Sequence, residues 1–230
     1  MPSRMLRRLL VGLTLTGAIG AALVTYWVAT PSEAPMAVSA PLAAWTSSAS
    51  PSAGSYNGDM KSLTAAFRPQ VYRSFCGPAS MATVLRAYGK DADQKTVVPS
   101  TLWKLKVFYS GMSLAELGSL AQQSGLRGRV VYADTIDATE FRELVKSNLS
   151  RAGDFVLINY DRKALKQAGA GHISPIAAYD STRDAFLVLD EAAYRYPFTW
   201  VPASLLYAAA RTRADEHYRG LLLVEGLASN

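Results

Sequence analysis

The sequence predicts an α+β domain in which helices come first and an antiparallel sheet follows. From Cys76 to Tyr88, apolar residues recur at helical spacing behind a cysteine, with a proline in the first turn and Gly89 as a stop. From His172 to Asp190, two apolar runs flank a polar turn, as in a β-hairpin. The helical part would therefore carry the cysteine, and the sheet would carry the histidine and the aspartate.

The composition argues for one globular domain and against several classes of function. The 230 residues are 50% hydrophobic, enough for one sizeable core. Half of the net charge of +6 lies in the first 30 residues, and no basic stripe with interleaved aromatics follows, so nucleic-acid binding is not expected. One cysteine excludes an internal disulfide, and with only two histidines we expect no protein metal site and no tightly bound cofactor.

Residues 1–30 are predicted to form a membrane anchor. The segment Leu9–Ala29 holds 21 uncharged residues behind a basic patch, long enough to span a bilayer. The arginines before it keep that end in the cytoplasm, which places the remainder in the periplasm. A cleaved signal is the alternative, but the nearest cleavage context, at Ala40, is followed by Pro41. We expect inner-membrane attachment, or a free periplasmic protein if cleavage occurs.

Residues 31–62 are predicted to be a flexible linker and residues 63–230 a catalytic domain. The linker is rich in Pro, Ala, Ser and Gly and could bury little surface. Inside the domain, Ser113 and Glu116 form a capping box that starts a helix. The other elements expected are strands at 129–133, 154–160 and 220–225 and helices at 137–149 and 202–212. The pattern of residues 91–110 predicts no clear helix or strand.

The late hairpin brings an imidazole and a carboxylate together. If its turn centres on Thr182, Asp190 lies opposite Ser174. His172 is then a diagonal neighbour of Asp190 on the same face, at about 7–8 Å between backbones and within side-chain reach. Pro175 cannot donate a ladder hydrogen bond, so we expect a sheet edge or a bulge at that point.

Four residues together fit nucleophilic catalysis by a thiol. The N-terminal end of a helix favours a thiolate, so the pKa of Cys76 is expected to be lowered. His172 would act as its base and Asp190 would orient the imidazole. Gln70, six residues before the cysteine, could donate to an oxyanion beside the Cys76 backbone N–H. The other histidine, His217, lies among charged residues and is expected to be solvated. The order Cys, His, Asp is that of papain-like folds.

Several stretches together resemble the phytochelatin synthase family, whose catalytic domain is papain-like. The resemblance runs from about Phe67 to Val224, and GHISPIAAYD and YRYP are its most specific blocks. The stretches are Gln70 with CGPAS and its helix, GMSLAELGSLAQQSG, GHISPIAAYD, FLVLDEAAYRYPFTWV and YRGLLLV.

The resemblance implies roles for particular residues. It makes Cys76 the nucleophile, His172 the base, Asp190 its partner and Gln70 the oxyanion donor. It also implies that Arg219 holds a carboxylate of glutathione, because arginine binds carboxylates in bidentate fashion. Two glycines next to these residues, Gly171 and Gly77, complete the expected substrate-binding set.

The activity implied is cleavage of the Cys–Gly bond of glutathione or a glutathione conjugate through a γ-glutamylcysteinyl thioester. Water or a second glutathione resolves the thioester, and transfer yields phytochelatin. Heavy-metal ions such as Cd and Zn enter as thiolate complexes of the substrate. The family usually has an arginine where this chain has Ala193, and plant members carry a cysteine-rich second domain that this sequence lacks. We therefore expect a short prokaryotic form that mainly hydrolyses.

Two other functions share the same residues. One is a papain-like peptidase that trims double-glycine leader peptides and has the same Gln, Cys, His, Asp order. The other is a non-catalytic, membrane-tethered module that binds glutathione or a thiol-bound metal. A homodimer is one oligomeric state that the sequence allows.

Overall fold

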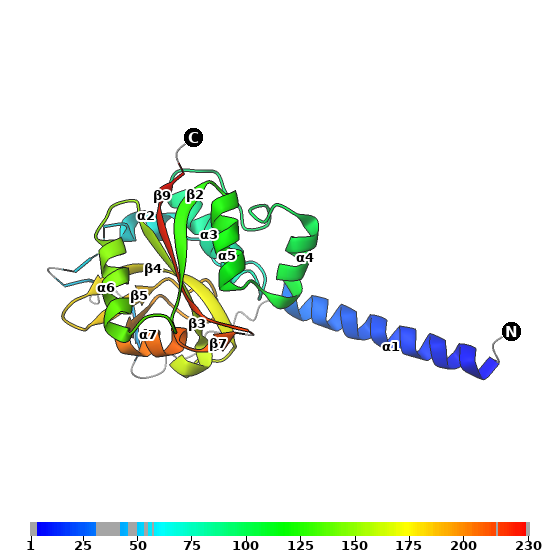
Figure 1. The fold of residues 1–230 in the computed structure, drawn as a ribbon. Helices are drawn as coiled ribbons and strands as arrows, with labels where there is room; N and C mark the ends of the chain where they lie inside the picture. The colour runs from blue at the N-terminus through cyan, green and yellow to red at the C-terminus, as the bar shows by residue number, and fades with distance from the viewer. Residues whose placement is uncertain are drawn as a thin grey trace.

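A seven-stranded antiparallel sheet forms the centre of the structure, with strand order β1-β6-β5-β4-β3-β9-β2 (Figure 1). The structure is a computed structural model that describes residues 4–30, 42–45, 50–52, 55–56, 58–214 and 216–228, with side chains from residue 17 onward. Its strands are β1 Ala43–Ala44, β2 Leu126–Tyr132, β3 Phe155–Asp161, β4 Gly171–Asp180, β5 Ala185–Val188, β6 Thr199–Pro202 and β9 Gly220–Leu227; β7 Arg213–Ala214 and β8 His217–Tyr218 pair separately.

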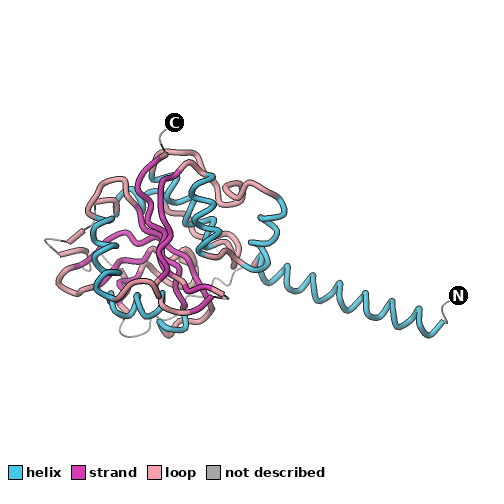
Figure 2. Tube along the Cα trace, in the orientation of Figure 1, coloured by secondary structure: helices cyan, strands magenta, loops and turns pink. Residues whose placement is uncertain are grey.

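Helices cover both faces of this sheet (Figure 2). One face carries α2, α3 and α5, and the other carries α6 and α7. Strand β3 shows why two cores form: Leu157 contributes to one hydrophobic cluster and Ile158 to the other, because neighbouring strand residues point to opposite faces. The helices are α1 Arg4–Ala29, α2 Met60–Ala66, α3 Cys76–Ala87, α4 Thr101–Ser110, α5 Leu114–Gln123, α6 Ala138–Leu149 and α7 Ala203–Ala210, with a 3₁₀ helix, η2, at Arg162–Leu165.

The α+β class predicted from the sequence is confirmed, and so are its main elements. The capping box is present: the Ser113 side chain accepts from the Glu116 backbone, and the Glu116 side chain accepts from the Ser113 N–H. The segment 91–110, for which the sequence predicted no clear element, contains α4, whose N-cap is Ser100. Its apolar side chains lie on several sides of the helix, and only Val107 is buried.

The late hairpin has the predicted turn and, near its open end, the predicted register. Ile176 pairs with Val188, and the Leu189 N–H donates to the Pro175 carbonyl at 2.9 Å, both as expected for a turn centred on Thr182. Nearer the turn the pairing shifts by one residue, because a bulge lies between Ile176 and Ala178. The bulge expected near Pro175 is therefore confirmed. The alternative of a sheet edge is wrong, since β4 lies between β5 and β3.

The range predicted as a linker contributes to the domain in its described parts. Strand β1 pairs with β6, and Tyr56 forms a bridge with Tyr179. Leu42 is buried and Trp45 packs against Phe198, so apolar side chains within this Pro- and Ser-rich stretch find partners on the sheet. Helix α2 also begins inside this range, at Met60, so the domain starts earlier than predicted. Residues 31–41, 46–49, 53–54 and 57 of the predicted linker lie outside the described residues.

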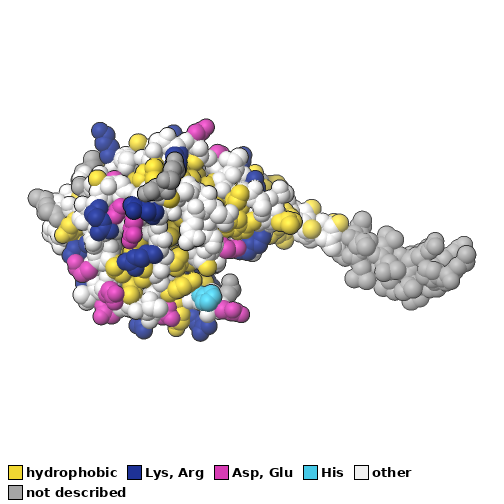
Figure 3. All heavy atoms as spheres, turned by 45° about the horizontal axis from the view of Figure 1, so that its top comes forward, with side chains coloured by type: hydrophobic (Ala, Val, Ile, Leu, Met, Phe, Trp, Pro, Cys, Tyr) yellow, Lys and Arg dark blue, Asp and Glu magenta, His cyan; other side chains and the backbone are white. Residues whose placement is uncertain are grey.

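The first helix, α1, meets the domain at its last turn and projects away from it (Figure 1). No helix within the described residues is both long and apolar enough to cross a bilayer. The predicted anchor Leu9–Ala29 falls partly outside the described side chains, which begin at residue 17. On the face shown in Figure 3, basic and acidic side chains are interspersed.

Candidate active site

The thiol of Cys76 lies at the start of α3, where this helix packs on β4. Cys76 is the first residue of the helix, and the Ser80 hydroxyl ties the same turn to the sheet by donating to the Ile173 carbonyl at 3.2 Å. Gly77 permits a close approach, because a Cβ there would lie 2.9 Å from the Met112 sulfur. Gly77 is buried under Met112 and does not line the cavity, so its position indicates packing rather than the substrate contact expected from the resemblance.

His172 and Asp190 meet as the hairpin register predicts. His172 Nε2 lies 3.0 Å from Asp190 Oδ1, and both side chains are buried. The N–H direction misses the carboxylate oxygen, so the contact is electrostatic rather than an aligned hydrogen bond. Such bonds are often poorly aligned in unliganded sites and tighten with substrate. Because Nε2 faces Asp190, Nδ1 is the nitrogen left to exchange a proton with the thiol.

Arg162, which no sequence pattern indicated as a site residue, holds the carboxylate of Asp190. Its Nη1 and Nη2 donate to Oδ2 and Oδ1 at 2.7 and 2.6 Å, and it is only 4% exposed. The guanidinium also stacks over the Tyr196 ring, 4.7 Å from its centroid. The Ala192 backbone N–H adds a further bond to Asp190 at 2.8 Å. Arg162 follows a strand in a charged stretch, and nothing local distinguishes such an arginine from an exposed one.

These neighbours determine the protonation states at the site. Burial alone would raise the pKa of Asp190, but Arg162 and the adjacent imidazole lower it well below its usual range. Burial and the positive charge of Arg162 lower the pKa of His172 to about 4. Burial raises the pKa of the Cys76 thiol to about 11, against smaller lowering effects from the backbone at Ile173, from Arg162 and from the backbone at Gly77. The unliganded pair is therefore a neutral thiol and a neutral imidazole.

The expected lowering of the pKa of Cys76 by the helix terminus is thus wrong for the free protein. Desolvation of a thiol that is only 7% exposed outweighs the helix dipole, whose effect is modest. The site can still generate the nucleophile, because the thiol proton can pass to His172 as the sulfur attacks a carbonyl carbon.

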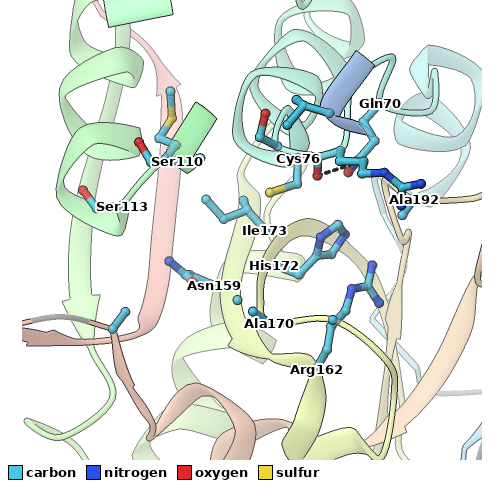
Figure 4. A pocket seen from close by; sticks show the side chains of 18 of the residues that line it. Gln70, Cys76, Ser110, Ser113, Asn159, Arg162, Ala170, His172, Ile173 and Ala192 are labelled. Carbon is cyan, nitrogen blue, oxygen red and sulfur yellow. Dashed lines mark hydrogen bonds between the residues drawn. The ribbon is translucent and has the colours of Figure 1, made fainter. Parts of the chain in front are cut away.

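Cys76 and His172 line the same cavity of about 710 Å³ (Figure 4). Its described lining holds six cationic side chains and no acidic one. Two of these cations are paired with acids outside the lining: Arg162 with Asp190, and Lys106 with Glu116. The cavity therefore favours anionic ligands. The cationic residues are Arg73, Lys106, Arg162, Arg195, Arg213 and Arg219.

Gln70 lines the cavity, but its amide is engaged by the loop. Nε2 donates to the carbonyls of Tyr72 and Arg73 at 2.9 and 2.8 Å, while the buried Oε1 has no partner. An oxyanion could receive a hydrogen bond from this side chain only after one loop carbonyl is released. The catalytic part predicted for Gln70 stays a prediction.

Arg219 and Gly171 lie in contact at the cavity wall. A Cβ on Gly171 would meet Arg219 Nη2 at 2.9 Å, so the glycine makes room for the guanidinium. Arg219 Nη1 donates to the Thr212 hydroxyl at 2.9 Å, which fixes its direction. Both residues line the cavity of Cys76. The placement is compatible with the expected carboxylate contact, and the substrate-binding roles of both residues stay predictions.

Two further residues clarify the boundary of the site. Asn159, on β3, is 5% exposed and lines the cavity; the sequence showed only a polar residue in an apolar strand run. His217 is exposed and stacks on Tyr132, and it lines a neighbouring cavity of about 280 Å³ that does not include Cys76. Its place away from the thiol agrees with its expected role as a solvated histidine. Within the described residues, no cluster of three or more His, Cys, Asp or Glu could hold a metal ion.

Comparison with known proteins gives a consistent set of similarities. The model of the phytochelatin synthase family matches residues 48–221. Glutathione gamma-glutamylcysteinyltransferase 3 of Lotus japonicus is 31% identical over 188 residues, which cover 76% of this chain and 39% of that protein. The Schizosaccharomyces pombe glutathione gamma-glutamylcysteinyltransferase is 28% identical, covering 66% and 40%. The chain thus spans about two fifths of the length of these relatives.

Among solved structures, the peptidase domain of Streptococcus ComA, a bi-functional ABC transporter, aligns with 69% of this chain and 96% of that domain. It does so at 17% identity with a TM-score of 0.45.

The raised pKa of Cys76 can be measured by alkylation. Because only the thiolate reacts, the rate with iodoacetamide should rise about tenfold per pH unit until the pKa of about 11. A free cysteine peptide should level off near pH 8.5. The Cys76→Ser variant should take up no label, because the chain has one cysteine. A plateau that begins below pH 8 would mean that the resting site already holds a thiolate and an imidazolium.

Proposed function

Because the chain belongs to the phytochelatin synthase family, we propose that it is a cysteine-dependent acyltransferase that cleaves the Cys–Gly bond of glutathione. The observation that carries this proposal is the cavity shared by Cys76 and His172, whose described lining contains basic side chains and no acidic one. Glutathione carries two carboxylates and a carbonyl that a thiol can attack. The name of the relatives, glutathione gamma-glutamylcysteinyltransferase, agrees with this chemistry.

The first half of the reaction forms a thioester. The sulfur of Cys76 attacks the Cys–Gly carbonyl carbon while its proton moves to His172 Nδ1. Asp190 stabilises the imidazolium through Nε2, at 3.0 Å in the free site. When the tetrahedral intermediate collapses, His172 returns the proton to the amine of the departing glycine, and a γ-glutamylcysteinyl thioester remains on Cys76.

The negative charge that develops on the carbonyl oxygen is stabilised at the start of α3. The backbone N–H of Cys76 lies in the first turn, where amides lack helical partners and the helix dipole is positive. Gln70 would join it after exchanging a loop carbonyl for the oxyanion, which is the stronger acceptor. Removing one such donor typically costs about 3–4 kcal/mol of transition-state stabilisation.

Water or a second glutathione resolves the thioester. Hydrolysis yields γ-glutamylcysteine, and transfer yields phytochelatin. We favour hydrolysis as the main outcome, because Ala193 replaces the arginine usual in the family. Ala193 is exposed in the turn next to Tyr194 and Arg195, which both line the cavity. Cadmium or zinc ions would enter as thiolate complexes of glutathione, as substrate.

A burst experiment tests the covalent step. With saturating glutathione, the wild-type chain should release glycine in a burst of about one equivalent before steady turnover. Cys76→Ser should release none, and His172→Gln should lower kcat about 10²–10⁴-fold, the usual size of general-base effects. His217→Gln is the matched control and should leave the rate unchanged. Glycine release by Cys76→Ser at the wild-type rate would overturn the mechanism.

The part of Arg219 in substrate binding can be separated from catalysis. Arg219→Gln should raise KM for glutathione about tenfold or more, the factor expected for the loss of a charged hydrogen bond to a carboxylate, with a smaller change in kcat. Arg211→Gln changes an exposed arginine outside the cavity and should leave both constants unaltered. A fall in kcat at constant KM would instead indicate that Arg219 positions the reacting groups.

We also propose that the N-terminal segment holds the domain at the periplasmic face of the inner membrane. What supports this is the described half of α1, where large apolar side chains are exposed: Ile19, Leu23 and Val24 are 50–63% exposed. A helix rarely keeps such side chains in water without a covering surface. The full chain should stay with membranes after carbonate extraction, and its complete release would reject the tether.

A further inference from the structure

The end of α1 reaches into the catalytic cavity from far away in the sequence. Trp27 and Val28 belong to the same cavity lining as Cys76 and His172. Val28 is only 3% exposed, although the helix around it projects from the domain. Figure 1 shows that α1 meets the domain only at its last turn, beside α4. Nothing in the chemistry proposed above uses these two residues.

The contact at this turn is a specific set of hydrogen bonds centred on Arg73. Its Nε donates to the Trp27 carbonyl at 2.7 Å, its Nη2 to the Thr30 carbonyl at 3.1 Å, and its backbone N–H to the Val28 carbonyl at 3.1 Å. The last carbonyls of a helix have no helical partners, and the negative end of the helix dipole favours a cation there. The guanidinium also lies over the Trp27 ring, 4.7 Å from its centroid.

A second attachment comes from α4. The Thr25 hydroxyl lies 2.9 Å from the Tyr109 hydroxyl, and Tyr109 is itself part of the cavity lining. The last turn of α1 is therefore held from two sides, by the loop that leads to the nucleophile and by α4. These bonds place the indole of Trp27 at a defined position on the cavity rim, where it is 60% exposed.

The loop that carries Arg73 is short and catalytically placed. It joins Gln70 to Cys76, and the Arg73 carbonyl accepts one of the Gln70 amide hydrogens at 2.8 Å. A change in the docking of α1 would therefore alter the contacts of Arg73, which lies only three residues before Cys76. The docked helix end forms part of the active site itself.

We propose that Trp27 and Val28 form a wall of the catalytic cavity that determines how large a molecule can reach Cys76. For substrate, this rests on the proposed function: tripeptide-sized thiols pass the wall, whereas glutathione conjugates with a bulky S-substituent are disfavoured. Removing the indole widens the entrance without touching the reacting groups. Removing the Arg73 contacts releases the whole wall.

The test compares the rates at which a small and a bulky reagent modify Cys76 in the full chain at one pH. Iodoacetamide is the small reagent and N-(1-pyrenyl)maleimide the bulky one. Trp27→Ala should raise the bulky-to-small rate ratio about tenfold, equivalent to removing a barrier of about 1.4 kcal/mol. Tyr26→Ala is the matched control: this neighbouring aromatic is 68% exposed and does not line the cavity, so the ratio should stay at the wild-type value.

A second pair of variants tests the contacts by which Arg73 holds the last turn of α1. Arg73→Gln should raise the ratio at least as much as Trp27→Ala, while Arg68→Gln should not, because Arg68 donates only to nearby carbonyls of its own segment. An unfolded site would reveal itself by a rise in the iodoacetamide rate as well. In that case Trp27→Ala, which removes a mostly exposed side chain, decides the matter. A ratio equal to wild type in Trp27→Ala would overturn the proposal.

Substrate selectivity gives the enzymatic readout. Trp27→Ala should increase kcat/KM for S-hexylglutathione relative to glutathione, and an unchanged preference would contradict the wall. If neither wild type nor variant releases glycine from either compound, the proposed function fails. The labelling ratio still tests the wall in that case, because it needs no turnover.

Discussion

The candidate site depends on one buried ion pair, between Arg162 and Asp190. A carboxylate that is 2% exposed can keep its charge only if a counter-charge with matching geometry desolvates with it. The planar guanidinium supplies two parallel hydrogen bonds, and stacking on Tyr196 holds it in place. Because Asp190 stays charged, it can, in the proposed mechanism, orient His172 and stabilise the imidazolium that forms during attack. Burial, together with the same guanidinium, lowers the pKa of His172 to about 4 and so keeps the resting histidine neutral.

Burial, rather than a neighbouring charge, determines the protonation state of the Cys76 thiol in the free site. At the residue after the nucleophile, a Cβ would lie 2.9 Å from the Met112 sulfur and 3.4 Å from Ile173, so Gly77 lets α3 pack closely against both side chains. That packing positions the sulfur at the cavity but removes it from water, which raises its pKa. A neutral thiol beside a neutral imidazole is protected from stray alkylation and oxidation. In the proposed mechanism the thiol becomes a nucleophile when a substrate carbonyl is present to accept the sulfur and its proton can move to His172.

As proposed above, the cavity around this pair combines recognition of carboxylates with a limit on the size of the molecule that reaches Cys76. Its arginines and lysine attract carboxylates, while the absence of acids among its described lining residues leaves nothing to repel them. Its rim is built from distant parts of the chain, including the last turn of α1, which Arg73 holds against the loop before Cys76. The N-terminal segment therefore has a structural place beside the chemistry, apart from any role as a tether.

The sequence by itself determined most of the helices and strands after residue 110, the hairpin that joins His172 to Asp190 and the helix that begins at Cys76. Each of these follows from local periodicity, caps and turn residues, which act over a few positions. Only the tertiary structure decided the features that depend on burial and on contacts between distant segments. It placed Arg162 on Asp190, engaged the Gln70 amide with loop carbonyls and reversed the expected shift in the pKa of Cys76. Desolvation and long-range pairing depend on which residues from distant parts of the chain surround a group. A short stretch of sequence does not contain that information.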